Sequence, residues 1–375
     1  MKNFASGKYI NQGYYKSFQP DFINREWLLD DMELLSLLSK ADRQLGRLDT
    51  YSEYIPDIDL FISMNVLKEA TQSSRIEGTQ TNIEEALLYK SDVSYERRDD
   101  WEEVQNYIAA MHLAIEKLKS IPFSSRLIRD THRTLLQGVR GEHKLPGEFR
   151  TSQNWIGGAT INDAIFVPPI HSSIGELMTD LEKFTHNTDY ELPDLIKIGI
   201  VHYQFETIHP FLDGNGRVGR LLITLYLVDK EILKKPILYL SDFFERHRGL
   251  YYDNLMRVRT HNDLKQWLKF FLTGVIETAK NGVQTFDDIL KLKEQSEIAI
   301  QKLGLRASNA QKILHYLFKR PIINIQTVVK ITDVSQRTAY NLIADLEKIG
   351  ILREITGSKK DKIYSFKQYL ALFER

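Results

Sequence analysis

The sequence contains no cysteine among its 375 residues. Disulfide bonds, thiolate catalysis and a cysteine-ligated zinc site are therefore excluded, and a cytoplasmic location is favoured. Long hydrophobic runs are also missing. The most conspicuous run, Leu221 to Val228, is far too short to span a bilayer, and the first residues lack the apolar segment of an export signal. We expect a chain that is neither exported nor bound to a membrane.

An excess of charge of one sign is missing as well. The chain has 50 basic and 50 acidic residues, which argues against a protein built as a whole to coat nucleic acid or an anionic membrane. One local exception stands out, because residues 306–375 carry 13 Lys and Arg against 6 Asp and Glu, a net charge of +7. At this length two or three domains are expected.

Apolar residues recur at three- and four-residue spacing through most of the chain, which predicts amphipathic helices and a mainly α fold. The segments with this period are 28–48, 60–76, 101–118, 124–136, 194–208 and 217–229. From residue 138 to residue 169 the period fails, and Gly, Pro, Asn and Thr are frequent. We interpret that stretch as a β-hairpin flap.

The last residues have a different pattern. "NAQKILHYL" and "NIQTVVKITDVSQRTAYNLIADLEKIGIL", followed by a basic turn and the strand-like "IYSF", predict a helix, a helix-turn-helix and a two-stranded wing. The predicted organisation has four parts: an N-terminal helical region (1–115), a helical core (116–280), a polar helical connector (281–300) and a winged-helix domain (301–375).

The stretch "TIHPFLDGNGRVGRLL" lies between two predicted core helices. Turn chemistry explains its Gly and Asn residues, but not Arg217 and Arg220, which share one face of the first turns of the second helix. The helix dipole disfavours arginine there unless an anionic ligand compensates. Two arginines beside Gly-flanked backbone amides favour a phosphate chain, and hence a nucleotide, as that ligand.

Two more side chains of this loop are candidates for binding a metal ion and for accepting a proton. Phosphates would repel the carboxylate of Asp213 unless a divalent cation such as Mg²⁺ stood between them. His209, with an ordinary pKa of about 6.5, is suited to taking a proton from a hydroxyl. The alternative interpretation is a turn whose histidine caps the preceding helix.

The residues "HPFLDGNGRVGR" match without a gap the motif His-Pro-Phe-x-Asp/Glu-Gly-Asn-Gly-Arg-x-x-Arg, and the chain resembles the Fic-domain family. The resemblance implies a helical fold with a β-hairpin flap. It implies an enzyme that transfers AMP from ATP to a Ser, Thr or Tyr hydroxyl of a protein and releases pyrophosphate. Relatives that transfer phosphate replace a glycine of this loop, and this loop keeps all of its glycines.

The same resemblance assigns roles to single residues. His209 corresponds to the base, Asp213 to the Mg²⁺ ligand and Phe211 to the core anchor of the motif. The predicted ATP contacts in the loop and helix are Gly214, Asn215, Gly216, Arg217, Val218, Gly219 and Arg220, of which the two arginines would reach the β- and γ-phosphates. The flap stretch "GEFRTSQNWIGG" and the pair in "GLYYDNL" supply further predicted ATP neighbours: Ile156, Gly157, Gly158, Tyr251 and Tyr252.

Far upstream, "SSRIEG" fits the family's inhibitory pattern Ser/Thr-x-x-x-Glu-Gly/Asn with Ser73, Glu77 and Gly78. Ser73 and Glu77 are one helical turn apart, and Gly78 is a helix stop signal. The resemblance implies that Glu77 pairs with Arg220 and denies it to the γ-phosphate; the alternative is an ordinary solvent-facing glutamate. Removal of AMP in the reverse reaction and a homodimer both stay open.

Two other functions were compared with AMP transfer. The first is a DNA-binding regulator with a Fic-like sensor core, which would place Arg337, Tyr340 and Asn341 in the groove and Lys359, Lys360 and Lys362 on the DNA backbone. The second is a metal-dependent phosphohydrolase built on His202, His209 and Asp213. The intact His209 and Asp213 favour AMP transfer over the first, and the position of His202 on the packed side of its helix argues against the second.

Overall fold

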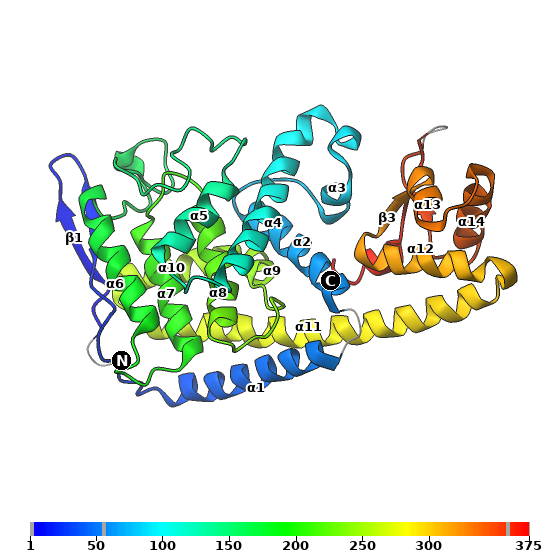
Figure 1. The fold of residues 1–375 in the computed structure, drawn as a ribbon. Helices are drawn as coiled ribbons and strands as arrows, with labels where there is room; N and C mark the ends of the chain where they lie inside the picture. The colour runs from blue at the N-terminus through cyan, green and yellow to red at the C-terminus, as the bar shows by residue number, and fades with distance from the viewer. Residues whose placement is uncertain (1–3, 55–57, 358–360, 375) are drawn as a thin grey trace.

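The computed structural model describes residues 4–54, 58–357 and 361–374 (Figure 1). Helices dominate, so the prediction of a mainly α fold is confirmed. Two small antiparallel sheets are present, with strand orders β1-β2 and β3-β5-β4. The predicted wing residues Lys359 and Lys360 lie outside the described residues.

The N-terminal region begins with a hairpin, which the sequence patterns did not predict. It is formed by β1 (Gly7–Asn11) and β2 (Lys16–Pro20). The helices that follow are α1 (Met32–Tyr54), α2 (Ile58–Ile76), α3 (Ile83–Leu87) and α4 (Arg98–Leu118). The periodic segments 28–48, 60–76 and 101–118 fall on α1, α2 and α4, so these helices are confirmed.

The middle of the chain forms the helical core. Its helices are α5 (Ser125–Leu135), α6 (Ile174–His186), α7 (Asp194–Ile208), α8 (Asn215–Asp229), α9 (Ser241–Arg246) and α10 (Arg248–His261). The Ser124 side chain caps α5 by accepting the Leu127 N–H at 3.4 Å, as the serine at the start of that segment predicts. Helices α5, α7 and α8 confirm three further periodic segments.

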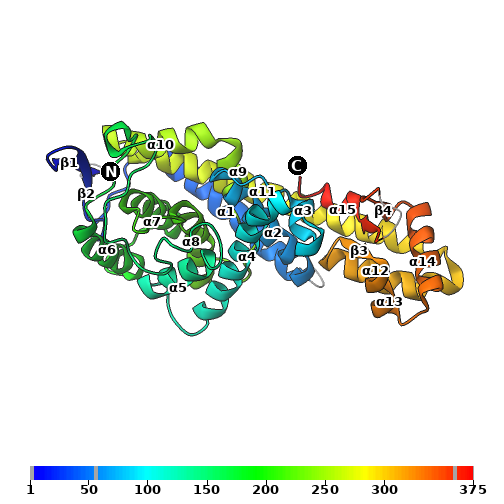
Figure 2. The same ribbon diagram turned by 90° about the horizontal axis from the view of Figure 1, so that it is seen from above.

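One long helix, α11 (Leu264–Gln301), joins the core to the C-terminal region. It is continuous through residue 281, where the sequence suggested a change from core to connector, and it packs along α1 (Figures 1 and 2). Beyond it lie α12 (Ala307–Lys319), β3 (Ile322–Asn324), α13 (Ile325–Thr332), α14 (Gln336–Lys348), β4 (Arg353–Glu354), β5 (Ile363–Ser365) and α15 (Lys367–Leu370).

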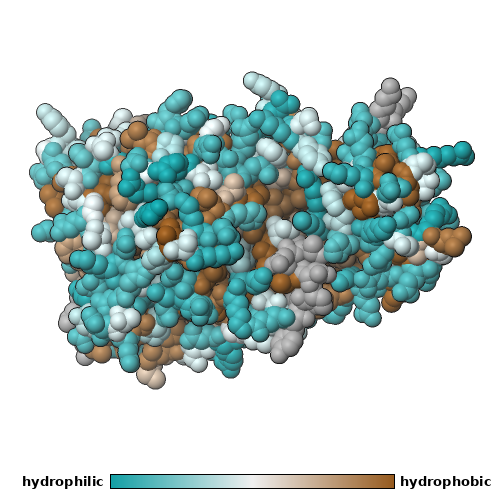
Figure 3. All heavy atoms as spheres, in the orientation of Figure 1, coloured by the Kyte–Doolittle hydropathy of each residue, from teal (hydrophilic) through white to brown (hydrophobic). Residues whose placement is uncertain are grey.

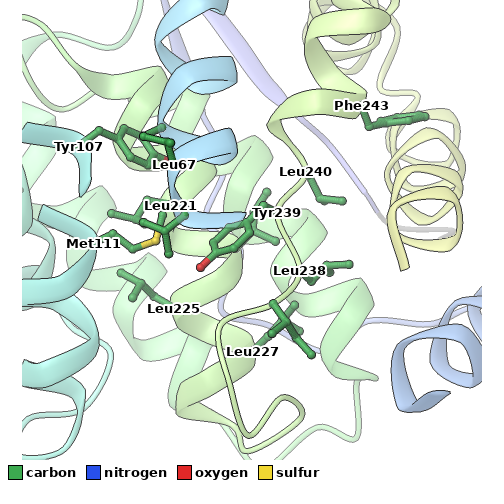
Figure 4. Packing of buried hydrophobic residues seen from close by; sticks show 14 of the residues in the cluster. Leu67, Tyr107, Met111, Leu221, Leu225, Leu227, Leu238, Tyr239, Leu240 and Phe243 are labelled. Atoms are coloured by element: carbon green, nitrogen blue, oxygen red, sulfur yellow. The ribbon is translucent and has the colours of Figure 1, made fainter. Parts of the chain in front are cut away.

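Apolar packing holds α2, α4 and α8 against one another (Figure 4). Leu67 of α2, Met111 of α4 and Leu221 of α8 are at most 4% exposed. Helices α7 and α8 are buried on nearly every side, which explains why apolar residues predominate on both of them. The loop between α7 and α8 is therefore fixed at both ends by the core.

The flap predicted for residues 138–169 is irregular, and within it Ile156 and Phe166 form a single antiparallel bridge. The Phe18 N–H of β2 donates to the carbonyl of Val167 at 2.9 Å, and the rings of Phe18 and Phe166 are 5.8 Å apart. The N-terminal hairpin thus lies against the end of the flap. These contacts join residues far apart in sequence, and local patterns do not encode such contacts.

Hydrophilic side chains cover most of the face seen in Figure 3, and apolar residues show in several places, including the region between α4 and the C-terminal elements. Among the described residues, no helix combines the length and apolar character that crossing a membrane requires.

Candidate active site

The loop between α7 and α8 is held in shape by its own side chains. The N–H of Phe211 donates to Oδ1 of Asn215, and Nδ2 of Asn215 donates back to the carbonyl of Phe211, both at 2.8 Å. Gly214 has φ +74°, a left-handed conformation that suits glycine. Phe211 is fully buried and stacks on His132 with ring centroids 3.7 Å apart. These contacts hold the loop in one conformation.

His209 ends α7 in a left-handed conformation, with φ +50°. Its Nδ1 atom is buried, so Nε2 is the nitrogen that an incoming hydroxyl could reach. Burial, together with the positive charges of Arg150 and Arg259, lowers the pKa of His209 to about 3. The imidazole is therefore neutral at physiological pH and able to accept a proton.

Arg150 positions both His209 and the flap, although the sequence analysis assigned it no role. Its guanidinium donates to four backbone carbonyls: those of His209 at 3.0 Å, Ser152 at 3.1 Å, Pro169 at 2.6 Å and Ile208 at 3.4 Å. The side chain is buried, and this burial lowers the pKa of Arg150 to about 10. Its charge faces the carboxyl end of α7, where the helix dipole is negative.

The start of α8 offers an anion site. The first N–H groups of a helix have no acceptor within it and point outward at the positive end of the dipole. In α8 these belong to Asn215, Gly216 and Arg217. A Cβ on Gly216 would lie 2.2 Å from Oε1 of Glu77, so the absence of a side chain is what lets an anionic oxygen approach this backbone.

The predicted metal ligand, Asp213, lies at the same helix start, and its side chain is 42% exposed. Oδ1 accepts the Gly214 N–H at 2.5 Å and lies 3.5 Å from Nη2 of Arg217. Mg²⁺ in nucleotide sites commonly takes one or two carboxylates and completes its shell with phosphate and water oxygens. A single accessible carboxylate beside the anion site fits that requirement. No group of three or more acidic, His or Cys residues that could hold a metal occurs among the described residues.

Arg217 and Arg220 are both buried, and each already has an acidic partner. Nη1 of Arg217 donates to Oε2 of Glu103 on α4 at 3.2 Å. Arg140 also binds Glu103, at 2.8 Å. Glu103 therefore fixes Arg217 at the helix start, a role that its sequence position did not reveal.

The predicted contact between the upstream segment and the loop is present in the structure. Nη2 of Arg220 donates to Oε1 of Glu77 at 2.7 Å. The same guanidinium donates to Oγ of Ser73 through Nε and to its carbonyl through Nη2, both at 2.9 Å. Gly78 follows with φ +105°, as expected for a residue that ends a helix. Segments 143 residues apart in the chain thus meet at Arg220.

The Glu77 carboxylate lies beside the anion site, because Oε1 would be 2.2 Å from a Cβ on Gly216. Burial opposes its ionisation, but the positive charges of Arg220 and Arg217 outweigh this effect and lower the pKa of Glu77. Glu77 is therefore ionised at neutral pH, and its side chain is 36% exposed. A carboxylate at this position competes with any phosphate for Arg220 and for the start of α8.

The remaining predicted loop residues have packing roles. Val218 is fully buried, and Gly219 faces Glu206, whose Oε1 would lie 2.2 Å from a Cβ at that position. In the flap, Gly157 and Gly158 have φ +69° and +78° and make the turn that follows the Ile156 bridge. All three flap residues are partly or fully exposed.

The two predicted tyrosines differ in their environments. Tyr251 is 1% exposed, and its hydroxyl is 2.9 Å from Nε2 of His202, so its ring is part of the core. Tyr252 is 38% exposed; burial and the charge of Glu77 raise its pKa. Of the pair, Tyr252 is the one accessible to a ligand.

His202 does not join the other two residues of the phosphohydrolase interpretation. Its Nδ1 is 2.9 Å from the Gly219 carbonyl, its Nε2 faces Tyr251, and burial lowers the pKa of His202 to about 3. The imidazole connects α8 to α10.

Two buried groups beside the loop were also missed by the sequence analysis. Nε2 of His132 lies 3.0 Å from the carbonyl of Asp213, and its Nδ1 accepts the Gly147 N–H at 2.8 Å. Because Nδ1 is an acceptor, the proton of the neutral ring is on Nε2, which donates to the Asp213 carbonyl. Burial raises the pKa of Glu206 to about 7, and its Oε1 has no hydrogen-bond partner in the described part of the chain. The sequence patterns did not single out His132 and Glu206, because their special environments arise from contacts with residues far away in the chain.

Two profiles of one known protein family match the chain. The profile of the Fic/DOC family N-terminal region matches residues 35–116, and that of the Fic/DOC family matches residues 122–227. The chain therefore belongs to the Fic/DOC family.

Curated relatives with the name Protein adenylyltransferase Fic align with part of the chain. The protein from Aedes aegypti is 33% identical over 125 residues, which make up 33% of this chain and 22% of that protein. The protein from Drosophila willistoni is 27% identical over 172 residues, 44% of this chain and 31% of that protein. The chain thus spans less than a third of the length of either relative.

Solved structures share the fold. A Fic family protein from Desulfovibrio desulfuricans G20 aligns with 91% of this chain and 98% of its own, with a TM-score of 0.59 and 18% identity. A Fic domain containing signaling protein from Bacteroides thetaiotaomicron VPI-5482 aligns with 68% of this chain and 96% of its own, with a TM-score of 0.53 and 18% identity.

Proposed function

We propose that this protein transfers AMP from ATP to a Ser, Thr or Tyr hydroxyl of a target protein, and also to itself. The observation that carries the proposal is the loop itself. A neutral His209 stands at one end of the loop, and at the other end the start of α8 and two buried arginines form an anion site. Membership of the Fic/DOC family and the names of its curated relatives support the same reaction.

In the proposed reaction, the hydroxyl oxygen of the target bonds to the α-phosphorus of ATP, and the bond from that phosphorus to the bridging oxygen breaks. Pyrophosphate leaves, and the hydroxyl proton passes to Nε2 of His209. The N–H groups at the start of α8 hold phosphate oxygens, while Arg217 and Arg220 hold the β- and γ-phosphates. Arg217 must exchange part of its contact with Glu103 for phosphate.

Asp213 would hold Mg²⁺ when ATP is bound. The ion would neutralise negative charge on the phosphates and on the leaving pyrophosphate. The accessible Asp213 carboxylate beside the helix start is the observation that supports this assignment.

In the resting state, Glu77 inhibits the reaction by pairing with Arg220 beside the anion site. Ser73 adds two hydrogen bonds that hold the guanidinium toward α2. ATP can bind productively only when the carboxylate has moved away. Once Glu77 has left the site, it is also a group that could take part in removing AMP, so the reverse reaction belongs to the same proposal.

We interpret the C-terminal region as a winged helix, because its order of elements is α12, β3, α13, α14, β4 and β5. Arg337, Tyr340 and Asn341 are exposed on α14, where a recognition helix would present them. A pocket of about 550 Å³ in front of α14 is bordered by Asp92 of the N-terminal region. DNA entering it would meet that carboxylate, so we rank DNA binding below AMP transfer.

The test of the proposed function adds His209→Ala to Glu77→Gly, which removes the inhibitory carboxylate. The double variant should fold and bind ATP nearly as Glu77→Gly does, because only the proton acceptor is lost, and it should transfer no AMP. Intact-mass measurement after incubation with ATP would detect the transfer, and isothermal titration would measure ATP affinity. Transfer by the double variant at the rate of Glu77→Gly would refute the assignment.

A further inference from the structure

The C-terminal region contacts the chain on both sides of Glu77. On α2, Phe61 packs edge-on against Phe318 of α12, with ring centroids 6.0 Å apart. Beyond Glu77, Nη2 of Arg320 donates to the carbonyl of Leu87 at 2.7 Å, and its guanidinium lies 4.2 Å from the ring centroid of Tyr89. The end of α12 therefore bridges the start of α2 and the segment that follows α3.

A pocket of about 620 Å³ opens at this junction, between α2, α4 and α12. Its apolar walls include Met64 of α2, Trp101 and Ile108 of α4, and Tyr316 of α12. This volume is typical of sites for small organic molecules, whose walls are largely apolar and aromatic with a few polar groups. No residue of the proposed ATP site lines the pocket.

The charged side chains that line the pocket all have one sign. Three cationic side chains line it, namely Lys90, Lys319 and Arg320, and no aspartate or glutamate does so among the described residues. Lys90 pairs with Glu102, and Arg320 is held by Leu87 and Tyr89. Lys319 is exposed and has no ion-pair partner in the part of the chain that the structure describes. An anion in the pocket would therefore find Lys319 available.

We propose that this pocket binds a small, flat, apolar molecule that carries one anionic group. The ring system would lie among Trp101, Tyr316 and Ile108, and the anion would pair with Lys319. The proposal does not depend on AMP transfer. It has a consequence for regulation, however, because α2 supplies one wall of the pocket and also carries Ser73, so the occupant and the inhibitory contact share one helix.

The test compares two dyes on the full chain. Anilinonaphthalene sulfonate has the proposed chemistry, and phenylnaphthylamine has the same rings without the charge. The sulfonate should bind more tightly, and Lys319→Glu should weaken its binding about fivefold, because one favourable exposed charge contact becomes unfavourable. The matched control is Lys312→Glu, an exposed lysine on the same helix that does not line the pocket.

Two further readouts locate the dye. Ile108→Trp should fill the pocket, so that the sulfonate no longer raises the melting temperature as it does for the wild type. Trp101→Phe should reduce energy transfer from tryptophan to the bound dye, because Trp101 lines the pocket and the other three tryptophans of the chain do not, while leaving the affinity of the dye nearly unchanged. Equal weakening by Lys319→Glu and Lys312→Glu, equal affinity for both dyes, or an undiminished thermal shift in Ile108→Trp would each overturn the proposal.

Discussion

Glu77→Gly should activate the protein. In the structure, one carboxylate oxygen is 2.7 Å from Nη2 of Arg220 and also lies beside Gly216, at the start of α8. Removing the carboxylate frees the arginine for the γ-phosphate and opens the helix start to the phosphate chain. Arg220 keeps its two contacts with Ser73, so the guanidinium should stay in place.

The size of the effect follows from the exposure of the pair. A charged hydrogen bond contributes about 1.5–3 kcal/mol, but the Glu77 side chain is 36% exposed, and solvent screening reduces this contribution. We expect about 1–2 kcal/mol for the inhibitory contact, which corresponds to an increase of roughly 5- to 30-fold in productive ATP binding. Glu77→Gln, which keeps a hydrogen-bonding group without the charge, should lie between the wild type and Glu77→Gly.

The assay is self-modification with α-labelled ATP at an ATP concentration below saturation. Wild type, Glu77→Gly, Arg220→Ala and the double variant are compared, and Glu96→Gly serves as an exposed control upstream of α4. Arg220→Ala and the double variant should be inactive, because both lack the γ-phosphate ligand. An inactive but correctly folded Glu77→Gly, or an active double variant, would refute the inhibitory pairing.

Three further predictions concern the surroundings of the loop. Asp213→Ala, or chelation of divalent cations in the wild type, should abolish transfer measured by label incorporation; full activity without divalent metal would contradict the role of Asp213. Arg150→Lys should lower the free energy of unfolding in urea by about 2 kcal/mol and reduce kcat, because lysine cannot reproduce the hydrogen bonds by which the guanidinium joins the flap to His209. Unchanged stability would contradict this role of Arg150. The raised pKa of Glu206, about 7, means that stability is greatest below its unfolded pKa and falls as pH rises through 7. Glu206→Gln should therefore be more stable than the wild type above that pH, by up to about 3 kcal/mol, and identical pH profiles of the melting temperature would refute this.

Much of the site could be predicted because its residues are close together in sequence. His209, Asp213, Arg217 and Arg220 lie on one short loop and the helix after it, so spacing alone indicates which side chains share the anion site. The helices were predictable for a similar reason, since burial of one face imposes a period on local sequence. The link from Glu77 to Arg220 needed a family pattern, because neither segment by itself indicates the other.

What could not be predicted depends on tertiary contacts. Arg150 looks like any polar residue of a flap, yet it is buried against four carbonyls. Glu103 sits in an amphipathic helix like many glutamates, and only the approach of α4 to α8 brings it to Arg217. Tyr251 and Tyr252 are adjacent in sequence, but only the packing of α10 shows that one belongs to the core and the other is accessible.

Transfer of AMP by this protein is tested by following the phosphorus atoms of ATP. Glu77→Gly is incubated in parallel with ATP labelled at the α-phosphate and with ATP labelled at the γ-phosphate, and protein-bound label is measured after denaturation. Glu77→Gly combined with His209→Ala is the control. The account predicts stable incorporation of α-label, none of γ-label, and neither in the control. Incorporation of γ-label, or α-label that persists without His209, would contradict it.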